Sequence, residues 1–132
     1  MSLLRRVLGV GGAVLVVIGV PLALIPGTIL QRLLGQRPLG DDAWIRQFAV
    51  ALIVIGLFHV LIIRKLDEVW WWSWAFVVFD GVSAIVAIIH AAIGVPEGSA
   101  SWPWWSYGAT SGSFAVLYLV GIARVGQEKP FV

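Results

Sequence analysis

One aspartate and two histidines lie inside long apolar runs of this sequence, where their side chains could transfer protons or ligate a metal. Asp80 lies about ten residues into the third run, which at about 1.5 Å of rise per residue is near the middle of a bilayer. An ionised carboxylate costs about 2.5–3.5 kcal/mol at that depth. Asp80 must therefore be paired, hydrogen-bonded or protonated. Asp80 is either a proton or cation site, or it forms a structural hydrogen bond with His59 or with a hydroxyl of the fourth run. Asp80, His59 and Ser83 form the candidate polar or proton site, and Ser83 lies on the same helical face as Asp80.

His59 and His90 are candidate ligands for a haem or a chlorophyll-type pigment, because imidazole is a common axial ligand. At about 1.5 Å per residue, His59 lies about 8 Å from one membrane border and His90 about 30 Å from the same border. The two side chains cannot share one iron. Either histidine alone could hold a pigment or a five-coordinate haem, or it could be a packing or interface residue. We therefore predict no cofactor, with a single-histidine pigment site as the alternative.

No enzymatic motif accompanies these residues. The sequence contains no HExxH, no GxSxG, no P-loop lysine and no pair of carboxylates at a shared depth. It has no cysteine, and two distant histidines with one aspartate are too few ligands for a metal site. We expect no catalytic residue, no metal centre and no enzymatic activity.

The elements that must position these residues are apolar along almost the whole chain. Of 132 residues, 60% are hydrophobic and 12% are charged, and the mean hydropathy is +0.95, which excludes an ordinary soluble domain. Each long run has the roughly 20 residues needed to cross about 30 Å of hydrocarbon. We predict an all-α integral membrane protein with four transmembrane helices in an antiparallel up-down bundle, a single domain over residues 1–132. The expected helices run from about Leu3 to Ile25, from Trp44 to Ile63, from about Val69 to Val95 and from about Trp104 to Val125.

The segment from Pro26 to Ala43 joins the first two predicted helices. Apolar residues alternate in it with polar ones, and this pattern predicts a short amphipathic helix that lies on the membrane surface. The apolar residues are Ile29, Leu30, Leu33 and Leu34, and the polar ones are Gln31, Arg32 and Arg37.

Basic and aromatic residues mark the borders of the predicted helices. Cytoplasmic loops carry an excess of Lys and Arg, so both termini are predicted to be cytoplasmic. Basic residues spread over helix borders set topology and do not make a nucleic-acid site. The predicted cytoplasmic side carries Arg5, Arg6, Arg64, Lys65, Arg124 and Lys129, and the other side carries Arg32 and Arg37. Two tryptophan belts are expected at the same borders, Trp70, Trp71, Trp72 and Trp74 on the cytoplasmic side and Trp44, Trp102, Trp104 and Trp105 on the other.

Small residues line one side of each predicted helix, as close packing in lipid requires. The fourth helix has two marked faces, one of which carries Tyr107, Ser111, Phe114, Tyr118 and Gly121. Gly108 and Gly112 are displaced from that face by roughly 100°. Either both faces pack inside this bundle, or the second face meets a neighbouring protein. The candidate interface residues are Gly108, Gly112, Trp102, Trp104, Trp105, Trp70, Trp71 and Trp72.

Short motifs in the first half of the chain carry a resemblance to a known family. After the glycine-rich first helix, Ile25-Pro26-Gly27 leads into Leu33-Leu34-Gly35, and Trp44-Ile45-Arg46-Gln47-Phe48 opens the second helix. In this order the chain resembles small four-helix bacterial inner-membrane proteins of the uncharacterised DoxX-like kind. The resemblance implies a four-helix bundle in a bacterial inner membrane, with no activity and no functional residues attached to it.

These observations favour a non-catalytic accessory or scaffold subunit of a larger bacterial membrane complex, of which respiratory and photosynthetic types are examples. Its expected partners are membrane lipid and other integral membrane subunits, in a hetero-complex, with no nucleic acid. Two alternatives from other classes stay open. One is a small proton-coupled transporter that uses Asp80. The other is a tetrapyrrole-binding subunit that uses His59 or His90.

Overall fold

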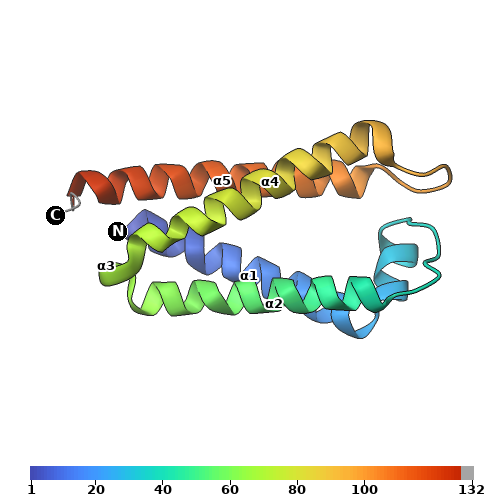
Figure 1. Ribbon diagram of the computed structural model, residues 1–132, viewed down its shortest axis with the longest axis horizontal. Helices are drawn as coiled ribbons and strands as arrows, with labels where there is room; N and C mark the ends of the chain where they lie inside the picture. The colour runs from blue at the N-terminus through green and yellow to red at the C-terminus, as the bar shows by residue number, and fades with distance from the viewer. Residues whose placement is uncertain (129–132) are drawn as a thin grey trace.

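The computed structural model describes residues 1–128 (Figure 1). Four of its helices are long and apolar enough to cross a membrane, which confirms the predicted all-α four-helix fold. They are α1 (Ser2–Leu24), α2 (Ala43–Arg64), a composite third helix over Leu66–Gly94, and α5 (Trp102–Glu128). The composite third helix consists of α3 (Leu66–Val69), the 3₁₀ turn η2 (Trp70–Ser73), α4 (Trp74–Ile89) and the π-helical turn η3 (His90–Gly94). Lys129, predicted to lie on the basic side, is outside the described residues.

The helices form two antiparallel pairs, α1 with α2 and α4 with α5 (Figure 1). The two pairs also pack against each other, chiefly through α1 and α5. We call the end that carries the N-terminus and α3 the terminal end, and the end that carries the two longer connections the loop end (Figure 1). The large core residues that join the pairs come from the terminal half of the bundle: Leu4, Val7, Leu8, Ile62, Leu66, Trp70, Phe76, Tyr118, Ile122 and Val125.

The composite third helix turns its small and polar face inward, as its pattern predicts. Asp80, Ala84 and Ala87 are buried at the three- and four-residue spacing of one helical face. The branched residues of the opposite face are exposed, namely Val82, Ile85, Ile89 and Ile93. Small inward residues let α5 approach closely, which is how helices associate where lipid supplies no hydrophobic drive.

Glycines bring α1 and α2 into close contact. A Cβ added at Gly12 would lie 2.8 Å from the Cβ of His59 and 2.9 Å from the carbonyl oxygen of Gly56. Two turns further along α1, a Cβ at Gly19 would lie 2.9 Å from the carbonyl oxygen of Ala49. The missing side chains therefore allow the two backbones to touch. Each contact recurs after seven residues on both helices, an interval typical of left-handed helix pairs.

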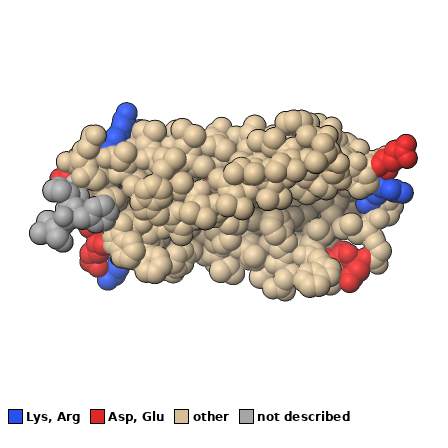
Figure 2. Space-filling model, turned by 45° about the horizontal axis from the view of Figure 1, so that its top comes forward, with Lys and Arg blue, Asp and Glu red and all other residues tan. Residues whose placement is uncertain are grey.

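Charged side chains lie at the two ends of the molecule in the view of Figure 2, and the long surface between them shows none. Large apolar side chains in the middle parts of the long helices are exposed, for example Val17 at 70% and Val78 at 61%. Lipid solvates such a surface, whereas water does not. The distribution fits a protein that crosses a membrane several times.

The connection from α1 to α2 contains a short helix, as predicted. Within the segment from Pro26 to Ala43, the helical part ends with the π-helical turn η1 (Thr28–Leu33). Gly35 follows with φ +61°, a left-handed conformation that terminates helices, and Pro38 cannot continue one. The short helix therefore lies within the amphipathic stretch of the sequence, and Gly35 and Pro38 set its end.

Hydrogen bonds join the two connections at the loop end, and we call this set the loop latch. The backbone N–H of Ala100 donates to the carbonyl oxygen of Gly35 at 2.9 Å. The side-chain amide of Gln36 donates to the carbonyl oxygen of Ala100, also at 2.9 Å, and the backbone N–H of Arg37 donates to Oγ of Ser99 at 3.2 Å. The two helix pairs are thus connected at the loop end as well as through the core of the terminal half.

Candidate functional site

Asp80 lies at the midpoint of the composite third helix, 14 residues from Leu66 and 14 from Gly94. It is on the buried face and only 7% exposed. Ser111 of α5, which is also buried, donates a side-chain hydrogen bond to the Asp80 carboxylate. The bond supplies a hydrogen-bond donor to an acid in an apolar core, and it joins α4 to α5.

His59 and Tyr118 form a second buried hydrogen bond, between α2 and α5. The distance from Nε2 of His59 to the Tyr118 hydroxyl oxygen is 2.9 Å, and both residues are 0% exposed. Nδ1 of His59 lies 2.8 Å from the carbonyl oxygen of Ile55. Because a carbonyl only accepts, Nδ1 carries the hydrogen, and Nε2 of the neutral ring accepts the hydroxyl proton of Tyr118. The fold therefore selects one tautomer of His59.

Aromatic rings and a glycine hold this pair in place. The His59 ring stacks on Phe76 of α4, with ring centroids 3.7 Å apart and planes inclined by 23°. Phe114 lies one turn from Tyr118 on α5, and their centroids are 6.1 Å apart. Gly11 of α1 faces the Tyr118 hydroxyl so closely that a Cβ there would collide with it. Three helices and the glycine of a fourth thus enclose the hydroxyl.

Asp80 and Tyr118 are close enough for the carboxylate to interact electrostatically with the hydroxyl. We call Asp80, Ser111, Tyr118 and His59 the buried polar cluster. It draws on α2, α4 and α5. Ser83, predicted with Asp80 and His59 as part of the polar site, is half-buried and makes no hydrogen bond to the cluster.

The sequence places Ser111 and Tyr118 on one face of the fourth predicted helix but does not mark them as site residues. They are seven residues apart on α5, or about two helical turns, so they share the inward face. Their hydroxyls are of the kind predicted as structural partners of Asp80. The sequence signal that could have identified them is a pair of hydroxyl residues seven apart on one helix, when another helix carries an acid near the middle of the membrane.

The buried polar cluster contains three kinds of group that can exchange protons, namely a carboxylate, a phenol and an imidazole. The Tyr118 hydroxyl donates its proton to Nε2 of His59. Residues 1–128 contain no group of three or more His, Cys, Asp or Glu side chains that could bind a metal ion.

The two histidines lie in different parts of the fold. Both ring nitrogens of His59 are hydrogen-bonded, so a pigment on His59 would have to displace Tyr118 or the carbonyl of Ile55. His90 lies in η3 near the loop end, where its ring packs edge-on against Trp104 with centroids 4.4 Å apart. Within residues 1–128, no group accepts a hydrogen bond from the buried indole nitrogen of Trp104.

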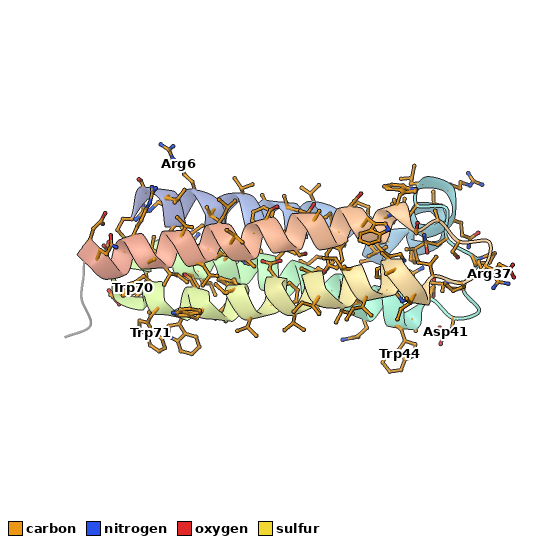
Figure 3. All side chains as sticks on the ribbon, turned by 90° about the horizontal axis from the view of Figure 1, so that it is seen from above. Arg6, Arg37, Asp41, Trp44, Trp70 and Trp71 are labelled. Atoms are coloured by element: carbon orange, nitrogen blue, oxygen red, sulfur yellow. The ribbon has the colours of Figure 1, made fainter. Side chains whose placement is uncertain are left out.

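The residues predicted to contact a partner differ in their surroundings. Gly108 and Gly112 both face α4: a Cβ at Gly108 would lie 2.8 Å from Cγ1 of Ile88, and one at Gly112 would lie 3.7 Å from the Cβ of Ala84. This face of α5 thus packs inside the bundle. Figure 3 shows the side chains of Trp71 and Trp44 pointing away from the bundle, near its opposite ends. Of the predicted tryptophans, Trp71, Trp72, Trp102 and Trp105 are exposed, Trp104 is half-buried and Trp70 is buried.

A second feature of the surface lies on α1. An open apolar groove of about 360 Å³ runs along this helix, and we call it the α1 groove. Small residues and branched residues line it side by side. It is lined by Gly9, Val10, Ala13, Val14, Val17 and Ile18.

No protein-family model, curated protein or solved structure matches this chain. The resemblance to DoxX-like proteins therefore stays a prediction. The functional proposals depend on the buried polar cluster and the α1 groove themselves.

Proposed function

We propose that this protein is a non-catalytic accessory or scaffold subunit of a larger bacterial membrane complex. It crosses the inner membrane four times, keeps both termini in the cytoplasm and contacts lipid and other integral membrane subunits. The apolar surface between two charged ends supports the membrane location. The gathering of Lys and Arg at the terminal end supports the orientation.

The α1 groove is the observation that carries this proposal. α1 uses Gly11, Gly12 and Gly19 for close contacts inside the bundle. Gly9 and Ala13 are exposed on another side of the helix, where they line the groove. Small residues four apart let the backbone of a second helix approach, and van der Waals contact then drives association in lipid. The valines that line the groove are stiff at χ1, so they lose little entropy when a helix packs against them.

Filling the groove tests the proposal. Gly9→Leu combined with Ala13→Leu closes the groove with side chains, and Val54→Leu on the exposed face of α2 is the matched control. The wild type and Val54→Leu are expected to purify from native membranes in lipid nanodiscs with the same stoichiometric membrane partner. The groove variant should lose that partner while it keeps its helical circular dichroism. A wild type that purifies alone, or a partner that stays bound to the filled groove, contradicts the proposal. Absence of a tetrapyrrole absorption band from the purified complex would exclude the pigment alternative.

The buried polar cluster favours a second candidate, a small proton-coupled transporter that uses Asp80. An intramembrane acid connected to a tyrosine and a histidine is an arrangement in which protons can be taken up and released. Proton flux into proteoliposomes, driven by a potassium diffusion potential and followed with a pH-sensitive dye, measures this activity directly. Asp80→Asn should abolish the flux, whereas Ser113→Ala, at an exposed serine of α5, should not. Equal flux in the wild type and Asp80→Asn would exclude this role of Asp80.

A further inference from the structure

We propose that α5 carries a surface for a second copy of this chain, and that two copies associate in the membrane through Ser106 and Thr110. The inference goes beyond the scaffold function, because this surface lies on a different helix from the α1 groove. Ser106, Ala109 and Thr110 are exposed and share one face of α5, at the three- and four-residue spacing of a helix. We call these three residues the hydroxyl face.

The hydroxyl face differs from the other surfaces that the long helices expose. The composite third helix exposes branched aliphatic residues such as Val82 and Ile85, and α2 exposes Val54. Side chains of that kind are as apolar as lipid tails and need no partner there. Ser106 and Thr110 each carry a hydroxyl, which is both a donor and an acceptor of hydrogen bonds. In agreement with this difference, α5 is the least apolar of the four membrane-spanning helices.

Both hydroxyls remain available to a neighbouring molecule. A serine or threonine in a helix can bond the carbonyl oxygen four residues earlier, as Ser113 does with Ala109 at 2.8 Å. Within residues 1–128, the hydroxyls of Ser106 and Thr110 form neither that bond nor another hydrogen bond. The hydrogen-bonding capacity of the face is therefore unused in the isolated chain.

The depth of the hydroxyl face in the membrane determines what can pair with it. Thr110 is adjacent to Ser111, which bonds Asp80 at the midpoint of the composite third helix. Thr110 therefore lies near the middle of the hydrocarbon, and Ser106 lies about 6 Å from it toward the loop end. The borders of the hydrocarbon are about 15 Å from its middle, so neither water nor lipid headgroups reach these hydroxyls. A helix of another protein molecule does, because serine and threonine form hydrogen bonds across membrane helices.

A second copy of the chain matches the hydroxyl face in orientation and in chemistry. Two copies inserted the same way round are related by a two-fold axis along the membrane normal, so their α5 helices meet in parallel. Each residue then lies opposite the same residue of the second copy, at the same depth. Because a hydroxyl both donates and accepts, Thr110 can bond Thr110 of the second copy, and Ser106 can pair in the same way. Ala109 carries only a methyl group, which lets the two backbones approach.

The charges of α5 are compatible with this pairing. The first charged residue of α5 is Arg124, so the face carries no charge at the depth of the two hydroxyls. Arg124 lies 13 residues beyond Ser111, or about 20 Å along the axis, which is outside the hydrocarbon. Helices that cross at about 20° near Thr110 diverge toward that end, and this separates the two guanidinium groups.

Energy transfer between labelled copies of the purified chain tests the proposal. Donor- and acceptor-labelled copies are mixed in vesicles of phosphatidylethanolamine and phosphatidylglycerol, and the protein-to-lipid ratio is varied. The wild type is expected to form dimers. Thr110→Val keeps the shape of the side chain without its hydroxyl and should weaken the dimer about three- to twentyfold, the factor for one hydrogen bond between membrane helices. Thr110→Ser keeps the hydroxyl and should dimerise as the wild type does. Ser113→Ala is the matched control, because the hydroxyl that it removes already bonds the backbone of its own chain.

Disulfide cross-linking locates the surface independently of side-chain energetics. The chain contains no cysteine, so Thr110→Cys places a single thiol on the hydroxyl face, and oxidation by copper phenanthroline should link two copies. Val82→Cys, on the exposed face of α4, should stay unlinked. A wild type that is monomeric at every protein-to-lipid ratio overturns the proposal. A dimer that Thr110→Val leaves unchanged, or that is linked through Val82→Cys instead, also overturns it, because the copies would then meet on another surface. Both measurements use the purified chain alone, so they can fail while a partner still binds the α1 groove.

Discussion

Two glycines of α1 that differ only in their surroundings allow a direct test of how this bundle is held together. A Cβ at Gly12 would lie 2.8 Å from the Cβ of His59 and 2.9 Å from the carbonyl oxygen of Gly56, so α2 must move. A Cβ at Gly9 would have one neighbour, Cδ1 of Ile63 at 3.9 Å, which is ordinary contact. Overpacking of this kind costs about 1–3 kcal/mol. Replacing glycine by alanine inside a helix gains about 0.5–1 kcal/mol in both variants.

The backbone gain cancels when the two variants are compared. Gly12→Ala is therefore expected to be less stable than Gly9→Ala by about 1–3 kcal/mol, and Gly9→Ala to be more stable than the wild type by about 0.5–1 kcal/mol. Reversible unfolding by sodium dodecyl sulfate in mixed micelles, followed by circular dichroism, measures both values. Equal stability of the two variants would show that α1 and α2 do not approach through Gly12, and the pairing of these helices would then be wrong.

The same unfolding assay applies on α5, where Gly108→Ala is expected to be about 1–3 kcal/mol less stable than Gly112→Ala, because a Cβ at Gly108 would lie 2.8 Å from Ile88. Tyr118→Phe should cost about 0.6–1.7 kcal/mol, the range for hydrogen bonds between membrane helices. A double-mutant cycle with His59→Leu checks this, and additive effects would mean that the 2.9 Å bond contributes nothing. Gln36→Ala removes a bond of the loop latch, so hydrogen exchange at the Ala100 amide should become roughly two- to tenfold faster. Unchanged exchange at Ala100 would show that the latch does not depend on Gln36.

The number of helices and their inward faces could be predicted because they follow from length and period. Every third or fourth residue of the third helix is small or polar around Asp80, and the branched residues between them meet lipid. Which helices pair could not be predicted. All four carry small residues, and the choice of α1 with α2 depends on contacts such as Gly12 with Gly56, which join residues far apart in sequence.

The candidate site was predictable in part, for a related reason. Asp80 and His59 are conspicuous because a polar group in an apolar run is costly. Ser111 and Tyr118 are not conspicuous, since hydroxyls in helices carry little penalty and many face lipid or bond their own backbone, as Ser113 does with the carbonyl oxygen of Ala109 at 2.8 Å.

The energetics of Asp80 bear on whether the buried polar cluster is only a structural connection between helices. An ionised aspartate at the bilayer centre costs about 2.5–3.5 kcal/mol, and a hydrogen bond between membrane helices returns about 0.6–1.7 kcal/mol. The bond from Ser111 therefore does not offset the cost of the charge. Asparagine would accept the same hydrogen bond without that cost, so a purely structural role would leave Asp80→Asn at least as stable as the wild type. What aspartate adds over asparagine at this position is the capacity to take up a proton, and this is the property that the comparison of proton flux in the wild type and Asp80→Asn measures.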